Sequence, residues 1–388
     1  MSRSRVLVVV GTRPEAIKMG PVVAALRARE SEVETRVALT GQHTDLVHQV
    51  LTTFRLDPAY ELGIMKEAQS VHDVIDGSLR GLRGVVQDFR PDALLVQGDT
   101  ATVFAAALVG FLERVRVGHV EAGLRSHDKW APFPEEIFRR LADVLSDYYF
   151  APTAGARAEL LAENVPPDRI WVTGNPVVDA LLTVSAQARP IQDVALGSII
   201  ADLSARLVLL TAHRRESFGA PLREVFAAVR ALADRVADAH VVYPVHPNPN
   251  VTVPARELLS GHPRIHLTAP LDYFDLVAAL EAASVVLTDS GGIQEEAPTF
   301  GTHVLVLRNV TERPEGVEAG VAELVGTNGS RILERALAAL QTRSRRGRSE
   351  PATPARNPYG DGRAGERIAD IVVSDLTGAP RTTEDWTA

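Results

Sequence analysis

The chain has 388 residues, a formal net charge of −8 and no cysteine. This length exceeds what one hydrophobic core usually serves, so two domains are expected. The negative charge argues against nucleic acid as a partner, and the lack of cysteine excludes disulfides, thiolate zinc sites and a cysteine nucleophile. The apolar run at residues 6–10 is too short for a signal peptide, and no run reaches the roughly 18 residues of a membrane helix. A cytoplasmic protein with no membrane partner is therefore expected.

Short β-branched runs alternate with longer amphipathic stretches along the whole chain. In the first half, strands are predicted at residues 5–10, 34–39, 93–97, 115–120, 148–151 and 170–173, and helices at 14–29, 71–89 and 101–113. In the second half, strands are predicted at 207–211, 240–245, 265–269, 285–288 and 304–307, and helices at 221–237, 271–283 and 293–300. Such alternation predicts an α/β fold, with parallel sheets covered by helices on both faces.

The chain divides in sequence near Gly174-Asn175-Pro176. Two Rossmann-like doubly wound domains are expected, residues 1–175 and 176–362, facing each other across a cleft. A helix at 363–376 is expected to cross back to the first domain. The tail 377–388, rich in Thr, Pro, Arg and Asp, and the basic loop 343–356 are both expected to be disordered. Ligands of open α/β sheets bind at the carboxyl ends of the strands, so functional residues are sought there.

The clearest candidate anion site is the segment DSGGIQEE, which follows the predicted strand at 285–288 and opens a helix. Gly291 and Gly292 would let a phosphate approach the backbone, and Ser290 adds a hydroxyl donor. Glu296, one turn later, could accept a hydrogen bond from a ribose hydroxyl. An ordinary capped helix start explains the same spacing equally well.

A second candidate anion site, GTRPEAIK, follows the first strand directly. Pro14 suits the first position of a helix, which leaves Arg13 at the strand–helix turn, where a guanidinium can bind phosphate. Lys18 follows near the first helical turn. The alternative is that both charges are simply solvated.

Three acids fall at strand ends or at a proline-stopped turn. Asp99 ends the strand at 93–97, Glu121 ends the next strand, and Glu135 follows Pro134 at a helix start. Their convergence on one rim could raise one pKa toward neutrality, as acid–base catalysis requires. Asp99 could instead be only a helix N-cap, and the group could be a solvated acidic face.

The remaining motifs are weaker. His213 follows the first strand of the second half and could assist a phosphate leaving group, while Arg313 lies in the segment TERPEG. An isolated histidine or arginine of this kind is more often structural. Dinucleotide, Walker, serine-elbow and zinc-histidine motifs are absent from the sequence.

Taken together, the motifs resemble the non-hydrolysing UDP-N-acetylglucosamine 2-epimerase family. The segments that carry the resemblance run in order from residue 11 to residue 362: GTRPEAIKMGPVV, QGDTATVFAAAL, VGHVEAGLRS, PFPEEIFRR, TGNPVVDAL, TAHRRESFG, YPVHPNPNV, LTDSGGIQEEAP, RNVTERPEGVEAG and NPYGDG. They cover nearly the whole chain.

The resemblance implies a GT-B-like pair of domains and a reaction without metal or nicotinamide cofactor. UDP-GlcNAc and UDP-ManNAc would be interconverted by anti elimination of UDP, through 2-acetamidoglucal, and re-addition with C2 inverted. The implied catalytic residues are Asp99, Glu121, Glu135 and His213. The implied UDP- and substrate-binding residues are Arg13, Lys18, His213, Ser290, Gly291, Gly292, Glu296 and Arg313. Homodimers are usual in the family, and the product would feed a bacterial polysaccharide or an antibiotic sugar.

The sequence departs from the family pattern near a second UDP-GlcNAc site that many bacterial members use for activation. Asp45-Leu46 follows Gln42-His43-Thr44, Gly77 stands where an arginine is usual, and Phe138 stands where asparagine is usual. Asp45 would place a like charge near a diphosphate, which costs affinity. Weak or absent allosteric activation is therefore expected, although Leu46 and Phe138 could instead reshape the site for another UDP-acetamido sugar.

Three other functions compete with the epimerase. A hydrolysing relative would release ManNAc and UDP. A GT-B glycosyltransferase would need an acceptor and would leave the carboxylate rim without a task. A catalytically inactive sugar-nucleotide sensor would not need Asp99, Glu121, Glu135 and His213 together.

Overall fold

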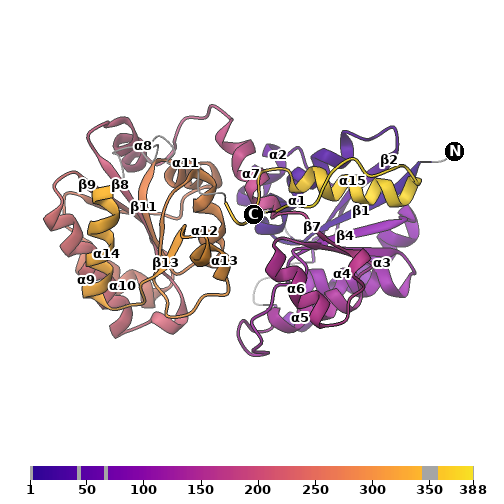
Figure 1. Ribbon diagram of the computed structural model, residues 1–388, viewed down its shortest axis with the longest axis horizontal. Coiled ribbons are helices and arrows are strands. Elements are labelled where there is room, and N and C mark those ends of the chain that lie inside the picture. Colours follow the sequence, from indigo (N-terminus) through magenta and orange to yellow (C-terminus); the bar gives the residue numbers. More distant parts are fainter. Residues whose placement is uncertain (1–2, 42–44, 65–68, 343–356, 388) are drawn as a thin grey trace. The chain divides into compact units, whose positions relative to one another are not determined.

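The computed structural model describes residues 3–41, 45–64, 69–342 and 357–387. The chain forms two compact units, each drawn in Figure 1. Unit 1 comprises Met1–Ala180 and Tyr359–Ala388, and unit 2 comprises Leu181–Pro358. The chain therefore passes into unit 2 after Ala180, slightly later than the predicted boundary at Asn175.

Unit 1 is a seven-stranded sheet in the order β3-β2-β1-β4-β5-β6-β7, with every pairing parallel. Its strands are β1 (Ser4–Val10), β2 (Val33–Leu39), β3 (Tyr60–Glu61), β4 (Ala93–Gln97), β5 (Arg116–Val120), β6 (Tyr148–Ala151) and β7 (Ile170–Val172). Its helices are α1 (Arg13–Arg27), α2 (Asp45–Thr53), α3 (Val71–Phe89), α4 (Ala101–Leu112), α5 (Glu135–Val144), α6 (Ala154–Ala162), η1 (Pro167–Arg169), the start of α7 (Pro176–Ser185) and α15 (Ala364–Thr377).

Unit 2 is a six-stranded sheet in the order β10-β9-β8-β11-β12-β13, again all parallel. Its strands are β8 (Arg206–Thr211), β9 (Ala239–Pro244), β10 (Ile265–Thr268), β11 (Ala283–Thr288), β12 (Val304–Val306) and β13 (Ala322–Leu324). Its helices are α8 (Val194–Ala201), η2 (Arg215–Ser217), α9 (Ala220–Arg235), α10 (Pro249–Leu259), α11 (Tyr273–Ala282), α12 (Gly291–Glu296), η3 (Ala297–Phe300), α13 (Pro314–Glu318) and α14 (Gly329–Thr342). The predicted class, two doubly wound α/β domains, is confirmed.

The central strands explain why these sheets are parallel and covered. Every residue of β4 and β11 is buried, and residues 94–96 of β4 and 285–287 of β11 are uninterrupted apolar runs rather than alternating ones. Burial on both faces produces that pattern, and it requires helices above and below the sheet. In unit 1, α4 supplies much of this cover, with Val103, Ala106 and Val109 in the core.

The C-terminal segment returns to unit 1. Helix α15, yellow in Figure 1, lies along α1, and Gly365 permits the approach because a Cβ there would lie 2.8 Å from the backbone of Pro21. Asp370 of α15 accepts hydrogen bonds from the amides of Thr382 and Thr383, which follow the helix, both at 2.7 Å. The Trp386 amide donates to the Val172 carbonyl at 2.6 Å.

The expectation of a disordered tail is therefore wrong for residues 378–387. Polar side chains in this tail are used for specific hydrogen bonds rather than for solvation. The loop at 343–356 lies outside the described residues, so that expectation remains a prediction. Among the described residues, no helix has the length and apolar character that crossing a membrane requires.

Candidate functional site

In unit 1, the carboxyl ends of three neighbouring strands carry the candidate site. Strands β1, β4 and β5 lie side by side, and they lead into the segments that hold Arg13, Asp99 and Glu121. The turn after β5 places Glu121 at a φ of +67°. That left-handed conformation costs a non-glycine residue roughly 1–2 kcal/mol, and such strain is concentrated at functional positions.

Glu121 is a buried carboxylate, 5% exposed, surrounded by donors. Its Oε1 atom accepts from Lys18 Nζ at 2.6 Å and from Asn175 Nδ2 at 2.7 Å, and its Oε2 atom accepts from the Gln97 side chain. A carboxylate with a cation and two amide donors is stabilised in its charged form. The ammonium group of Lys18, which was predicted to bind the nucleotide, thus contacts Glu121.

Asp99 is joined to α5 by Arg139. The buried guanidinium of Arg139 forms an ion pair with Asp99 and lies 3.5 Å from Glu136. Glu135, at the first position of α5, is partly exposed and lies one helical turn before Arg139. The structure therefore brings Asp99 to the helix that carries Glu135.

A buried histidine supports the turn before Asp99. His119 Nε2 lies 2.7 Å from the Gly98 carbonyl, and its Nδ1 lies 2.7 Å from Asp143. Burial alone would lower the pKa of His119, but the charge and hydrogen bond of Asp143 outweigh it and raise this pKa above its usual value. Arg125 pairs with the same Asp143 at 2.7 Å. These contacts hold the Gly98–Asp99 turn in place through the Gly98 carbonyl.

Glu15 is a residue that the sequence reasoning missed. It is 2% exposed and accepts hydrogen bonds from the Gly11 amide at 2.6 Å and the Thr12 hydroxyl at 2.9 Å. Burial, with a smaller contribution from the charge of Asp99, raises its pKa to about 7. The Thr-x-x-Glu spacing of Thr12 and Glu15, typical of a helix capping box, could have found it.

In unit 2, β8 and β11 are neighbours, and their carboxyl ends bring His213 and Asp289 together. The buried carboxylate of Asp289 accepts from the backbone amides of His213 at 2.7 Å and Arg214 at 2.8 Å. The His213 ring stacks on His246, with centroids 5.5 Å apart. Burial lowers the pKa of His213, reinforced by His246 and Arg214 and opposed by Asp289, so the imidazole is mainly neutral at pH 7.

The segment after β11 supplies the predicted anion-binding residues. Ser290 precedes α12 and makes no side-chain cap of that helix. A Cβ added at Gly291 or Gly292 would meet nothing closer than 3.7 Å and 3.6 Å respectively. Gly292 is exposed, whereas Gly291 is buried beside Glu312 and Arg214. Glu296 closes this helix and is partly buried.

Arg313 lies against the C-terminal end of α12. Its guanidinium forms an ion pair with the buried Glu295. The neighbouring Glu312 contacts Arg308 at 2.6 Å and Arg214 at 3.4 Å. Arg313 is therefore near the predicted nucleotide segment, but its Nε atom is held by Glu295 from α12.

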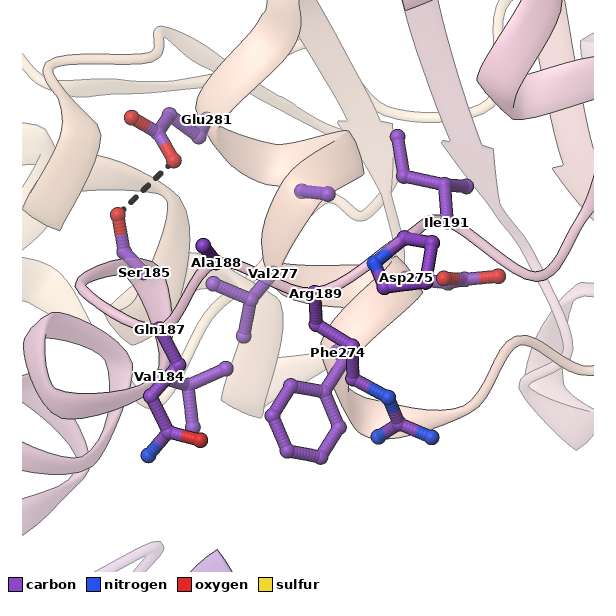
Figure 2. A pocket seen from close by; sticks show the side chains of 12 residues that line it. Val184, Ser185, Gln187, Ala188, Arg189, Ile191, Phe274, Asp275, Val277 and Glu281 are labelled. Carbon is purple, nitrogen blue, oxygen red and sulfur yellow. Dashed lines mark hydrogen bonds between the residues drawn. The ribbon is translucent and has the colours of Figure 1, made fainter.

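A pocket elsewhere in unit 2 contains none of these residues. Figure 2 shows it between α11 and residues 184–191, with Ser185 donating to Glu281 at 2.9 Å on one wall. Arg189 covers the ring of Phe274 at 4.1 Å and lies 3.7 Å from Asp272. Arg189 and Glu281 in this pocket already have the partners just described, so the pocket adds no candidate nucleotide site.

The positions that depart from the family pattern are partly described. Phe138 is buried and stacks on Phe104 with ring centroids 5.5 Å apart, so it packs α5 on α4. Gly77 lies in α3, where a Cβ would sit 3.2 Å from Ile64. Gln42, His43 and Thr44 lie outside the described residues, as do the side chains of Asp45 and Leu46. Among the described residues, no three His, Cys, Asp or Glu side chains form a metal-binding group.

Comparisons with known proteins agree with this arrangement. A family model described as UDP-N-acetylglucosamine 2-epimerase matches residues 24–373. The UDP-N-acetylglucosamine 2-epimerase of Yersinia pestis is 45% identical over 94% of this chain and 97% of its own length. A crystal structure of UDP-GlcNAc 2-epimerase from Neisseria meningitidis bound to UDP-GlcNAc is 38% identical, with a TM-score of 0.83 over 96% of this chain and all of that one. The Methanocaldococcus jannaschii enzyme in complex with UDP-GlcNAc and UDP is 31% identical, with a TM-score of 0.75 over 95% of this chain and 99% of that one.

Proposed function

This chain belongs to the UDP-N-acetylglucosamine 2-epimerase family, and from that premise we propose that it interconverts UDP-GlcNAc and UDP-ManNAc without hydrolysing them. The relatives from Neisseria and Methanocaldococcus bind UDP-GlcNAc. The observation that carries the proposal is Glu121, a buried carboxylate that contacts Lys18 in a strained turn after β5, the strand next to the one that leads to Asp99.

The proposed reaction removes the proton from C2 and breaks the bond between C1 and the UDP oxygen. The C2–H electrons form the double bond of 2-acetamidoglucal, and the electrons of the broken bond leave with UDP. Addition of UDP back to C1, with a proton delivered to the opposite face of C2, gives the epimer. A weakly acidic C–H needs a well-placed base, and a diphosphate leaving group needs donors.

Unit 1 is proposed to supply the proton-transfer groups, Asp99, Glu121 and Glu135. Asp99 and Glu135 belong to segments that Arg139 holds together. Lys18 is proposed to keep Glu121 ionised, given their 2.6 Å contact. Arg13, at the end of β1, is proposed to contact the phosphates.

Unit 2 is proposed to bind the nucleotide. Ser290, Gly291 and Gly292 would approach the diphosphate, and Glu296 would accept from the ribose. His213 would donate to the diphosphate as it leaves, which suits a half-buried imidazole anchored through its amide on Asp289. Arg313 is proposed to orient α12 through Glu295 as well as to add positive charge near the ligand.

Incubation with UDP-GlcNAc in D₂O tests the reaction. Deuterium at C2 of both intact UDP-sugars is the expected NMR result. Free ManNAc accumulating in step with UDP would instead identify the hydrolysing reaction. Asp99→Asn tests the site, with a loss of turnover of about a hundredfold or more expected for a proton-transfer group, whereas unchanged turnover would remove Asp99 from it.

Weak or absent activation by UDP-GlcNAc is part of the same proposal. Gly77 has no side chain and so supplies no cation where the family usually has an arginine. The reverse reaction started from UDP-ManNAc alone is therefore expected to proceed without a lag. A long lag that a trace of UDP-GlcNAc abolishes would contradict this.

A homodimer is also proposed. Helices α4 and α5 pack together and expose Phe111, Leu112 and Val144, at 57%, 65% and 75%. Exposed apolar groups of this size favour association. Sedimentation velocity at micromolar concentration is expected to show a dimer, and a monomer would refute the proposal.

A further inference from the structure

Glu15 lies between two of the turns that carry the candidate site, yet the proposed reaction assigns it no role. It is the third residue of α1, and its carboxylate turns back to the Gly11 amide and the Thr12 hydroxyl. The Thr100 side chain, in the β4–α4 turn, also interacts with this carboxylate and opposes the rise of its pKa. One buried side chain is therefore bonded to the β1–α1 turn and interacts with the β4–α4 turn.

Each of these turns holds a residue of the proposed site. Arg13 follows Thr12, and Asp99 precedes Thr100, which also caps α4. The two turns are closely packed, because a Cβ at Gly11 would lie 2.6 Å from the Thr102 hydroxyl. Thr102 in turn lies 3.2 Å from the hydroxyl of Thr40. Little space remains for either turn to move without the other.

We propose that Glu15 is a positioning residue for the reaction, whose carboxylate ties the turn of Arg13 to the turn of Asp99. This rests on the proposed role of Asp99. Glu15 does not contact the substrate in this proposal. It sets the position of Asp99 relative to α1, and its charge acts on Asp99 through space.

The charge state of Glu15 gives the proposal a distinctive signature. Its pKa of about 7 means that it gains a negative charge across the neutral range. Asp99 is the charged group that acts on it from the end of β4, whereas Lys18, one turn along α1, directs its ammonium to Glu121. The ionised form is a stronger acceptor than the protonated acid for the Gly11 amide and the Thr12 hydroxyl, so it holds the β1–α1 turn more firmly.

The test is the variant Glu15→Gln, with kcat and KM measured in the full-length enzyme from pH 6 to pH 8.5. Glutamine resembles the protonated acid, so the ratio of wild-type to variant kcat is expected to be near one at pH 6 and to rise to about tenfold at pH 8. KM is expected to change by less than about twofold. Glu30→Gln, an exposed position just beyond α1, is the matched control and should leave the ratio at one throughout.

A ratio that is the same at every pH would show a merely structural role and overturn the proposal. If Glu15→Gln does not fold by circular dichroism, Glu15→Asp replaces it. That side chain keeps the charge but cannot span both turns, so a lower kcat with unchanged KM is expected, and wild-type kcat would refute the proposal. The separate variant Asp99→Asn distinguishes the two levels: if its turnover is unchanged, the proposed role of Asp99 fails, and if only the Glu15 ratio is flat, the positioning role alone fails.

Discussion

At the scale of single residues, unit 1 contains acids and a histidine whose burial changes their proton affinity. Glu15 has its pKa raised to about 7 and Asp179 to about 6, in both cases mainly by burial. An acid with a raised pKa keeps its proton in the folded state after the unfolded chain has released it. Folding stability therefore falls as pH rises from the usual pKa to the raised one.

Glu15→Gln is expected to remove the part of this pH-dependent loss of folding stability that Glu15 causes. The raised pKa of wild-type Glu15, about 7 against 4.5, makes the wild type lose about 3 kcal/mol of unfolding free energy relative to the variant between pH 4.5 and pH 8. Urea unfolding of both proteins at the two pH values measures this. Asp179 is present in both and cancels, and a constant difference would contradict the buried, ionising state of Glu15.

His119→Gln is expected to show a pH dependence of the same sign, because the pKa of His119 is also raised in the folded protein. The pKa of His119 is raised in the folded protein, mainly because Asp143 outweighs the effect of burial. The contribution of His119 to the free energy of unfolding is therefore fully present below the usual histidine pKa. It is lost as pH rises through the pKa of His119 in the folded protein. We expect a loss of about 3 kcal/mol at pH 6 and a smaller loss at pH 9. The exposed His127, 3.2 Å from Glu159, is the control, with His127→Gln costing under about 0.5 kcal/mol.

Sequence reasoning could place the acids but not their partners. Asp99 and Glu121 are predictable because each directly follows a buried strand, and the carboxyl ends of parallel strands meet. The contact of Lys18 with Glu121 joins residues 103 positions apart, and Asn175 joins it across 54 positions. Such pairings depend on tertiary packing, so Lys18 was assigned to the nucleotide and Asn175 was passed over.

At the scale of elements, helix α15 depends on a close approach to α1. A methyl group at Gly365 would lie 2.8 Å from backbone atoms of Pro21, and backbone atoms cannot rotate away as a flexible side chain can. The same substitution at Gly84, on the exposed side of α3, meets nothing within 4 Å. The two glycines therefore form a matched pair.

Gly365→Ala is expected to destabilise the protein by about 1–3 kcal/mol, because the helices must separate to admit the methyl group. Gly84→Ala is expected to stabilise it by about 0.5–1 kcal/mol, since alanine favours the helix. Thermal unfolding should thus shift in opposite directions for the two variants. A gain of stability for Gly365→Ala would mean that α15 is not packed against α1 at this position.

Element boundaries were most predictable where local chemistry marks them. Helix α3 was predicted at its observed bounds, because Ser70 and Asp73 form a reciprocal capping box and Arg90 ends the helix in a left-handed conformation. Strands β3 and β13 were not predicted. Each has only two or three residues and lies at one end of its sheet, so neither has the length to create a readable pattern.

At the scale of the whole molecule, unit 2 is inserted in unit 1, which is completed only when the chain returns at Tyr359. The returning segment binds the unit 1 turn directly, since the Asn175 amide donates to the Tyr359 carbonyl at 2.7 Å. Arg367 also donates to the Thr173 carbonyl at 3.2 Å. Residues 1–180 alone therefore lack contacts that the folded unit uses.

We expect residues 1–180 expressed alone to be unfolded or aggregated, because the face of α1 that packs on α15 would be exposed. Joining them to residues 359–388 through a short Gly/Ser linker should restore a folded unit with cooperative unfolding. Residues 181–358 alone should fold, and isothermal titration should show that they bind UDP. A cooperative transition for residues 1–180 without the returning segment would refute this dependence.

The contact of the tail with β7 has a practical consequence. Strand β7 is the last in its sheet, and the side of Val172 that faces away from β6 is occupied, since its amide donates to Asp385 at 3.1 Å and its carbonyl accepts from Trp386. An open strand at this position would be a template for strand addition from another molecule. Affinity tags or fluorescent fusions attached after Ala388 would lie next to the tail residues that cover β7, so we expect aggregation of such fusions to reflect an uncovered sheet edge rather than a failure of either domain to fold.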